Sequence, residues 1–178
     1  VSKAISSIAA SLGFRIFIID DREDFSNPTR FPEAEQTVVS DYGSAFKKLP
    51  IGTNSFIVIA TRGHRYDASA TAAAMKTPAS YVGLLGSKRK TILIFEELFS
   101  EGFTMEEVQS VRSPIGLNIS ARTPEEIALS IMAEIVGFRL GGDGGTLKLN
   151  QLLIDKAAEK ADSRPENAPT PEAAVGAD

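Results

Sequence analysis

Short aliphatic runs alternate with helix-forming segments along most of the chain, and this alternation limits the possible folds more than any other feature. Each run is too short for a buried helix and is followed by Gly, Asp, Ser or Thr, so it predicts a buried strand. Strands that alternate with helices predict an α/β fold with a parallel, doubly wound, Rossmann-like sheet. The predicted strands cover residues 15–21, 37–40, 55–61 and 80–85, and the predicted helices cover 2–12, 43–49, 68–76, 87–101, 104–111 and 123–140.

The carboxyl ends of the predicted strands carry most of the polar residues that could bind a ligand. These ends are Asp20-Asp21, the Thr61–His64 segment and the Gly86–Lys88 segment. In doubly wound sheets, ligands bind in the crevice outside the carboxyl ends of the strands. We therefore expect these three groups to converge on one crevice.

The phrase Tyr81–Lys90 reads as a strand that ends in Gly86 and passes directly into a helix. That helix begins with Ser87, Lys88, Arg89 and Lys90. Cations at the positive end of a helix dipole are unfavourable by a few tenths of a kcal/mol each, up to ~1. Together with the free backbone N–H groups they would form an anion site. A solvated basic turn is the alternative interpretation.

Three other positions are candidates for binding, and each has a structural alternative. Asp21 could bind ligand hydroxyls, or it could pair with Arg22 at the surface. His64 could bind a ligand or donate a proton, or it could help to cap a helix, for which Asp67 is the expected N-cap. Gly116 would allow a positive φ or a close approach to a ligand, or it could simply form a tight turn.

Capping signals divide the chain. Thr104 with Glu107, and Thr123 with Glu126, have the spacing of capping boxes, and Pro124 suits the first helical position. The run GGDGG after residue 140 follows a helix rather than a strand, so we interpret it as a C-cap and linker and not as a phosphate loop. The predicted domains are a Rossmann-like domain at 1–140, a glycine linker with a terminal helix (Thr146–Lys160) at 141–160, and a disordered tail at 161–178.

Composition excludes several classes of function. The chain has no Cys, so disulfides, thiolate catalysis and Cys-based metal sites are excluded, and a cytoplasmic setting fits. The net charge of -4 gives no electrostatic basis for nucleic-acid binding. No apolar run is long enough to span a membrane, and no metal ligand set is evident, because His64 is the only histidine.

The spacing before Asp20-Asp21 suggests that a segment lies upstream of Val1. In dinucleotide-binding units, an acid at this position binds ribose hydroxyls about 20 residues after a glycine fingerprint. Here that distance extends beyond Val1, and the sequence opens on a helix without G-x-G-x-x-G. We therefore expect the first, central strand and its glycine loop to precede this sequence or to come from another segment.

Four phrases, in this order and spacing, resemble the Rossmann domain of xanthine dehydrogenase accessory proteins of the XdhC/CoxI type. The first strand and the glycine loop of that domain are missing from this sequence. The resemblance covers about residues 1–139 and is specific because the four phrases occur together. They are IIDDREDFSNPTRFPEAEQTVV (Ile18–Val39), the run through Thr61, His64 and Asp67, YVGLLGSKRK (Tyr81–Lys90) and SPIGLNISARTPEEIALSIMAEIV (Ser113–Val136).

The resemblance implies a chaperone that matures molybdenum hydroxylases and is not itself an enzyme. Such proteins bind the molybdenum cofactor (molybdopterin) while a cysteine desulfurase partner sulfurates it, and they help to insert it into apo-enzymes of the xanthine or CO dehydrogenase type. It also implies a homodimer, and a crevice in which Lys88 and Arg89, above Gly86 and Ser87, hold the cofactor phosphate. Asp20, Asp21, Thr61, His64 and Gly116 would complete this binding site.

Two other functions remain open on the sequence. The α/β pattern with Asp20-Asp21 is also compatible with an NAD(P)-dependent oxidoreductase or a nucleotide-binding domain, although a fold alone does not imply a function. An assembly module that dimerises through exposed strand edges is the third hypothesis.

Overall fold

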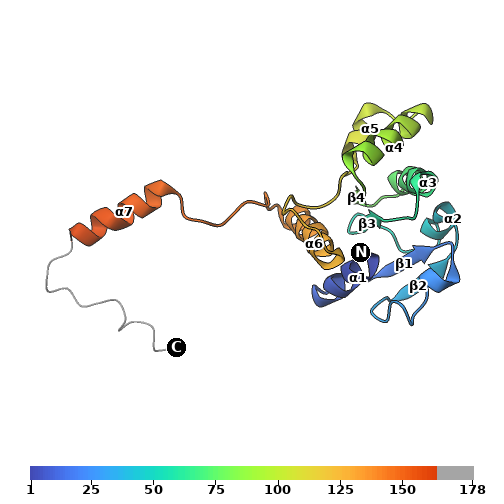
Figure 1. Ribbon diagram of the computed structural model, residues 1–178, viewed down its shortest axis with the longest axis horizontal. Helices are drawn as coiled ribbons and strands as arrows, with labels where there is room; N and C mark the ends of the chain where they lie inside the picture. The colour runs from blue at the N-terminus through green and yellow to red at the C-terminus, as the bar shows by residue number, and fades with distance from the viewer. Residues whose placement is uncertain (164–178) are drawn as a thin grey trace. The chain divides into compact units, whose positions relative to one another are not determined.

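A computed structural model describes residues 1–163 and divides the chain into two compact units. The first unit runs from Val1 to Gly144, and the second begins at Gly145. The first unit contains α1 (Ser2–Ser11), β1 (Phe17–Asp20), the 3-10 helix η1 (Glu23–Phe25), β2 (Gln36–Val39), α2 (Tyr42–Phe46), β3 (Phe56–Ile59), α3 (His64–Met75), β4 (Tyr81–Leu84), α4 (Lys88–Ser100), α5 (Met105–Ser110) and α6 (Pro124–Leu140), and the second contains α7 (Gln151–Asp162) (Figure 1).

The strands form two parallel pairs. Strand β1 pairs with β2 so that Ile18 lies opposite Thr37, and β3 pairs with β4 so that Ile57 lies opposite Val82. Arg112 adds a single parallel bridge beside Gly83 of β4. The predicted parallel α/β architecture is confirmed, but one continuous sheet is not present, because no ladder joins β1 to β3 within residues 1–163.

The two pairs are separate sheets within residues 1–163. One has the order β2-β1, and the other has the order β3-β4 with the Arg112 bridge beside β4. The residues of β1 are all only partly buried, whereas those of β4 are fully buried. Within residues 1–163, β1 has a ladder on one side only, with β2.

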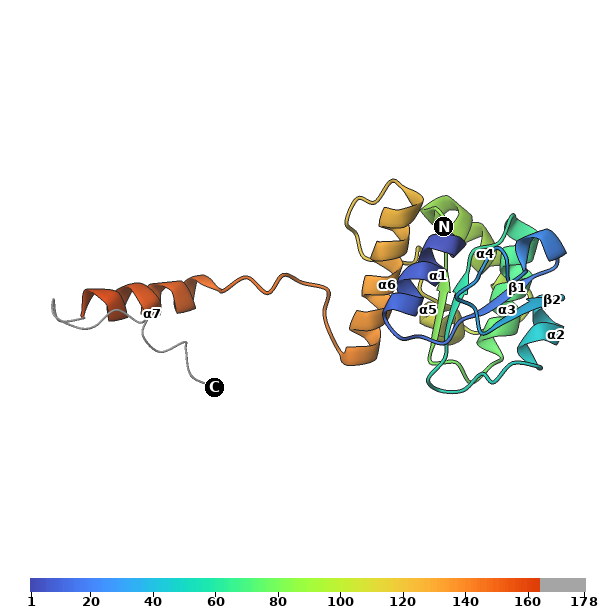
Figure 2. The same ribbon diagram turned by 90° about the horizontal axis from the view of Figure 1, so that it is seen from below.

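Helices cover both faces of the strands, as doubly wound topology requires. One buried cluster joins β3 and β4 to α3, α4 and α5. Its members include Ile59, Leu84, Ile94, Leu98 and Val108. The other joins α1 and α6 to the opposite face, and Figure 2 shows these two helices side by side. Its members include Ala9, Ile16, Ile115, Ile131 and Ile135.

The capping predictions are confirmed. Thr104 and Thr123 are N-caps of α5 and α6, and each forms both hydrogen bonds of a capping box with the Glu three residues on. Pro124 occupies the first turn of α6, and Gly141 ends that helix in the left-handed conformation with φ of 76°.

Two predicted boundaries differ from the structure. Helix α3 begins at His64 rather than at 68, and its N-cap is Gly63, so the prediction that Asp67 is the N-cap is wrong. Asp67 lies within the first turn of the helix, and its side chain is fully buried. That side chain binds a partner outside the helix, Thr61, and does not cap α3. Helix α7 begins after the N-cap Asn150, later than expected.

The predicted disordered tail at 161–178 lies almost entirely outside the described residues, which end at 163. Across the part of the chain that is described, no helix is both long enough and apolar enough to cross a membrane.

Candidate functional site

Asp20 closes β1 and is held by the residue two positions on. Its carboxylate accepts hydrogen bonds from the Arg22 backbone N at 3.1 Å, from Nε at 2.8 Å and from Nη2 at 3.1 Å. Partial burial alone would raise the pKa of Asp20, but the hydrogen bonds from Arg22 outweigh burial and hold this pKa below its ordinary value. The Arg22 guanidinium also lies 3.6 Å from the centre of the Phe25 ring. Asp20 is therefore a charged and already partnered carboxylate.

Asp21 connects the end of β1 to the end of β3. Its Oδ2 accepts a hydrogen bond from Arg62 Nη2 at 2.9 Å, and Arg22 Nε lies further away, 3.7 Å from Oδ1. Arg62 Nη2 also donates to the Tyr66 hydroxyl at 2.7 Å. The surface pair that the sequence suggested for Asp21 therefore forms mainly with Arg62, and a ligand would have to share or displace it.

Tyr42 lies close to the same carboxylates. Burial raises the pKa of Tyr42 to about 12, and the negative charges of Asp20, Asp21 and Asp67 act in the same direction. Tyr42 is the first residue of α2, and nothing in its local sequence marks it as part of a site. Arg62, which donates to both Asp21 and Tyr66, joins the acids after β1 to the first turn of α3.

A buried ion pair connects α3 to the start of α4. Asp67 Oδ1 accepts a hydrogen bond from Thr61 Oγ1 at 2.7 Å and a weaker one from Thr61 N at 3.3 Å. Its Oδ2 forms a salt bridge with Lys90 Nζ, and Asp67 is fully buried while Lys90 is 22% exposed. Thr61, Asp67 and Lys90, which we call the Asp67–Lys90 cluster, therefore link the ends of β3 and β4.

Gly86 is explained by the path of Lys90. A Cβ atom at Gly86 would lie 3.0 Å from Cδ of Lys90, so the lysine chain passes closely over the glycine to reach Asp67. Gly86 was predicted from the sequence as a site residue, whereas the pairing of Asp67 with Lys90 was not. The only local signal was the third consecutive base, since the contact depends on which way each side chain points.

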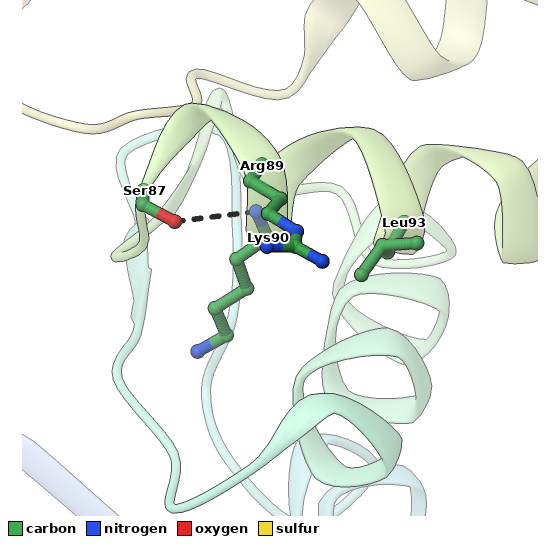
Figure 3. Close-up of a pocket in the computed structure, with 4 residues that line it drawn as sticks. All are labelled: Ser87, Arg89, Lys90 and Leu93. Atoms are coloured by element: carbon green, nitrogen blue, oxygen red, sulfur yellow. Dashed lines mark hydrogen bonds between the residues drawn. The ribbon is translucent and has the colours of Figure 1, made fainter.

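The remaining bases at the start of α4 point elsewhere. Ser87 is the N-cap, and its Oγ accepts a hydrogen bond from the Lys90 backbone N at 3.3 Å (Figure 3). Lys88 and Arg89 are exposed and form no salt bridge within residues 1–163. A hollow of about 360 Å³ lies along this turn, lined by Ser87, Arg89, Lys90 and Leu93. This turn therefore offers two exposed cations, first-turn N–H groups and open space to an anion.

Gly116 is accounted for by its packing against α6. Its φ is 105°, and a Cβ atom there would clash with Ser130 Oγ. Its backbone N donates a hydrogen bond to Glu134 Oε2 at 2.5 Å. These contacts correspond to the tight-turn alternative, so any contact of Gly116 with a ligand stays a prediction.

His64 occupies the first helical position of α3, directly after the N-cap Gly63. Its place at the end of the β3 loop agrees with the sequence, and its role in binding stays a prediction. Among the side chains that the structure describes, no three Asp or Glu gather as a metal site would require.

Parallel strand pairs with helices on both faces, and polar groups gathered where the strands end, define a Rossmann-type domain. Residues 1–135 match the XdhC Rossmann domain family, so the chain belongs to that family. The resemblance inferred from the four sequence phrases is thereby confirmed.

Three relatives are similar to most of this chain. It is 34% identical over 148 residues to "Uncharacterized protein YqeB" of Escherichia coli, an alignment that covers 83% of this chain and 27% of the relative. It is 29% identical over 135 residues to a protein of Bacillus subtilis named as a probable xanthine dehydrogenase subunit, covering 76% and 39%. It is 27% identical over 139 residues to "Molybdenum cofactor insertion chaperone PaoD" of Escherichia coli, covering 78% and 37%.

A crystal structure described as a xanthine dehydrogenase from Bacillus halodurans has a similar fold. The TM-score is 0.65, with 24% sequence identity, over 90% of this chain and 43% of that chain. This chain therefore spans less than half the length of each of these proteins.

Proposed function

We propose that this chain binds the molybdenum cofactor and supports its insertion into a molybdenum hydroxylase. The observation that carries the proposal is the start of α4 in a member of the XdhC Rossmann domain family. There Arg89 lines the hollow along Ser87–Leu93, and Lys88, the residue before it, is exposed. The names of two relatives, a cofactor insertion chaperone and a probable xanthine dehydrogenase subunit, support the same role.

The residues at this turn suit the phosphate of the cofactor. Phosphate oxygens accept hydrogen bonds from cations and from the backbone N–H groups of a first helical turn. Lys88 and Arg89 supply the cations, and Lys90 stays with Asp67, which keeps the turn fixed against α3. Asp20 and Asp21 would accept hydrogen bonds from cofactor hydroxyl or amino groups after one of their arginine pairs opens.

The finer role follows from the same proposal. The bound cofactor supplies the redox centre of the client enzyme, and this chain holds and shields it as cargo without turning over a substrate. A cysteine desulfurase is the expected partner for sulfuration, and an apo-enzyme of the xanthine or CO dehydrogenase type is the expected recipient.

A retention experiment tests the proposal. The full-length protein is loaded with molybdenum cofactor, passed through gel filtration, and its retained molybdenum is measured. Replacing Lys88 and Arg89 with Ala removes two charge-assisted contacts, so we expect retention to fall on the order of tenfold or more. The exposed pair Lys47 and Lys48, replaced in the same way, is the matched control and should retain cofactor normally. Equal retention in both variants would show that the turn is not the binding site.

Binding of NAD(P) is the second candidate function, because two acids end β1 where a ribose-binding acid is expected. Titration of NADH fluorescence against the full-length protein separates the two functions. Saturable NADH binding that is lost in Asp21→Ala, together with no retention of molybdenum, would favour the oxidoreductase or nucleotide-binding alternative.

A further inference from the structure

A hollow beside α6 takes no part in the proposed function. Its volume of about 330 Å³ lies at the lower end of the ~300–1,000 Å³ that is typical of small-molecule sites. It is bordered by α6, by Arg112 next to β4 and by the loop from Gly141 to Gly144. Three of these four loop residues are glycines, so few side-chain atoms fill the space. The hollow therefore has room for a small molecule.

Part of the wall of this hollow is apolar. Leu117, Ala133 and Phe138 line it, and Phe138 is 39% exposed, so part of its ring is open to a ligand. A Cβ atom at Gly144 would lie 3.0 Å from Cδ2 of Leu117, so the loop packs directly on this wall. Small-molecule sites share this character, in which apolar walls surround a few polar groups.

Arg112 supplies the hollow with a cation. It is exposed, and its guanidinium carbon lies 5.4 Å from the centre of the Phe138 ring. Among the described side chains, Arg112 forms no salt bridge. A guanidinium binds a carboxylate through two parallel hydrogen bonds, and stacking on an aromatic ring limits its orientations. Arg112 is therefore positioned to bind a carboxylate from solution.

Glu134 supplies the hollow with the opposite charge and keeps acceptor capacity. Its Oε1 accepts a hydrogen bond from the Tyr81 hydroxyl at 2.9 Å, and its Oε2 accepts one from Gly116 N at 2.5 Å. An ionised carboxylate has about four acceptor sites, so about two remain. Burial raises the pKa of Tyr81, the charge of Glu134 raises it further, and the charge of Arg112 opposes this shift. Both charges therefore act on one hydroxyl, yet Glu134 and Arg112 form no salt bridge with each other.

We propose that this hollow binds a small zwitterion, an α-amino acid with an apolar side chain. The Arg112 guanidinium donates two hydrogen bonds to the carboxylate of the ligand. The ammonium group of the ligand donates to the acceptor sites that remain on Glu134. The side chain of the ligand packs against Leu117, Ala133 and Phe138. Each of these three contacts uses a group that the fold leaves open to the hollow.

Other charge types fit this hollow less well. Asp143 also lines it, so two negative charges and one positive charge surround the ligand. A phosphate, with about two negative charges, would be repelled by Glu134 and Asp143. A simple amine would leave Arg112 without an anion. No residue of the hollow belongs to the start of α4 or to the Asp67–Lys90 cluster, so binding here does not depend on the proposed function.

Titration of the isotope-labelled full chain with three matched probes, followed by amide chemical shifts in NMR spectra, tests the proposal. L-leucine carries both charges, 4-methylpentanoate lacks the ammonium group, and 3-methylbutylamine lacks the carboxylate. A ligand this small should bind with a dissociation constant on the order of 1 mM, so the titration runs to about 20 mM. We expect L-leucine to give saturable shifts at the amides of Gly137, Gly142 and Gly144. Each of the other probes loses a charge-assisted contact and should bind at least about tenfold more weakly.

Two variants locate the ligand. Arg112→Gln removes the cation and should weaken the binding of L-leucine at least about tenfold. Ala133→Leu fills the hollow while both charges stay in place, and it should abolish binding. Arg65→Gln changes an exposed arginine of α3 outside the hollow, so this matched control should bind like the wild type. Circular dichroism checks that each variant folds.

Four results would overturn the proposal. They are the absence of saturable shifts with L-leucine, shifts confined to amides away from the hollow, equal binding of L-leucine and either single-charge probe, and binding that survives Arg112→Gln unchanged.

Discussion

At the scale of single residues, the structure reassigns the three consecutive bases at the start of α4. Lys88 and Arg89 remain in solvent, while Lys90 turns inward to the fully buried Asp67. A buried carboxylate is tolerated only with a close cation and hydrogen-bond donors, and Lys90 and Thr61 supply them. Lys90 therefore stabilises the fold, whereas Lys88 and Arg89 remain available to bind an anion.

Replacing Lys90 with Met should destabilise the fold by about 3 kcal/mol, because the Asp67 charge would stay buried without its cation. Urea unfolding at neutral pH measures the change in free energy. Lys88→Met is the matched control, and as a surface substitution it should change stability by no more than about 0.5 kcal/mol. Similar values for the two variants would mean that the Asp67–Lys90 pair does not hold the cluster together.

Gly116→Ala tests the packing explanation of that glycine. The positive φ of 105° and the contact with Ser130 Oγ both oppose a Cβ atom, so we expect a loss of about 1–3 kcal/mol. Gly52→Ala is the control, because a Cβ atom at Gly52 would meet nothing within 4 Å and its φ is not positive. Thermal unfolding of the two variants compares them, and a neutral Gly116→Ala would contradict the assignment.

At the scale of elements, the α6 start gives a pH-dependent prediction. Hydrogen bonds from Thr123 N and Arg122 N to its carboxylate lower the pKa of Glu126 below its ordinary 4.5. Because the folded pKa is depressed, the carboxylate contributes stability above about pH 4.5, and this contribution is lost as the pH falls through the folded pKa. The wild type should therefore exceed Glu126→Ala in stability at pH 7, and this difference should shrink towards pH 3. A difference that does not change with pH would exclude the ionised carboxylate as its source.

Features that depend on neighbours in sequence were predictable, and features that depend on distant contacts were not. The caps at Thr104 and Thr123 are encoded within four residues, so their pattern predicted them correctly. The local pattern predicts Asp67 as an N-cap and fails, because its real partner Lys90 lies on another helix, 23 positions along the chain. The missing ladder between β1 and β3 also depends on long-range strand pairing, so no local sequence pattern could predict it.

At the scale of the whole molecule, the chain consists of a core unit ending at Gly144 and a second unit that begins at Gly145. The second unit contains α7, which has no buried residue, and its leucines Leu149, Leu152 and Leu153 are 63%, 61% and 46% exposed. A helix of this length is marginal in water without packing. The stability of the core unit should therefore come from residues 1–144 alone.

Truncation after Gly144 tests this division. We expect the shortened chain to unfold at the same urea midpoint as the full chain, within about 0.5 kcal/mol in free energy, because α7 has no buried residue. Phe138→Ala is the comparison that should lower the midpoint. Phe138 is 39% exposed, but its ring centre lies 5.2 Å from that of Tyr81 and 6.3 Å from that of Phe56, so losing these ring contacts should destabilise by about 1–2 kcal/mol. A clear drop in the midpoint of the truncated chain would mean that residues after 144 contribute to the core, and the two units would then fold as one.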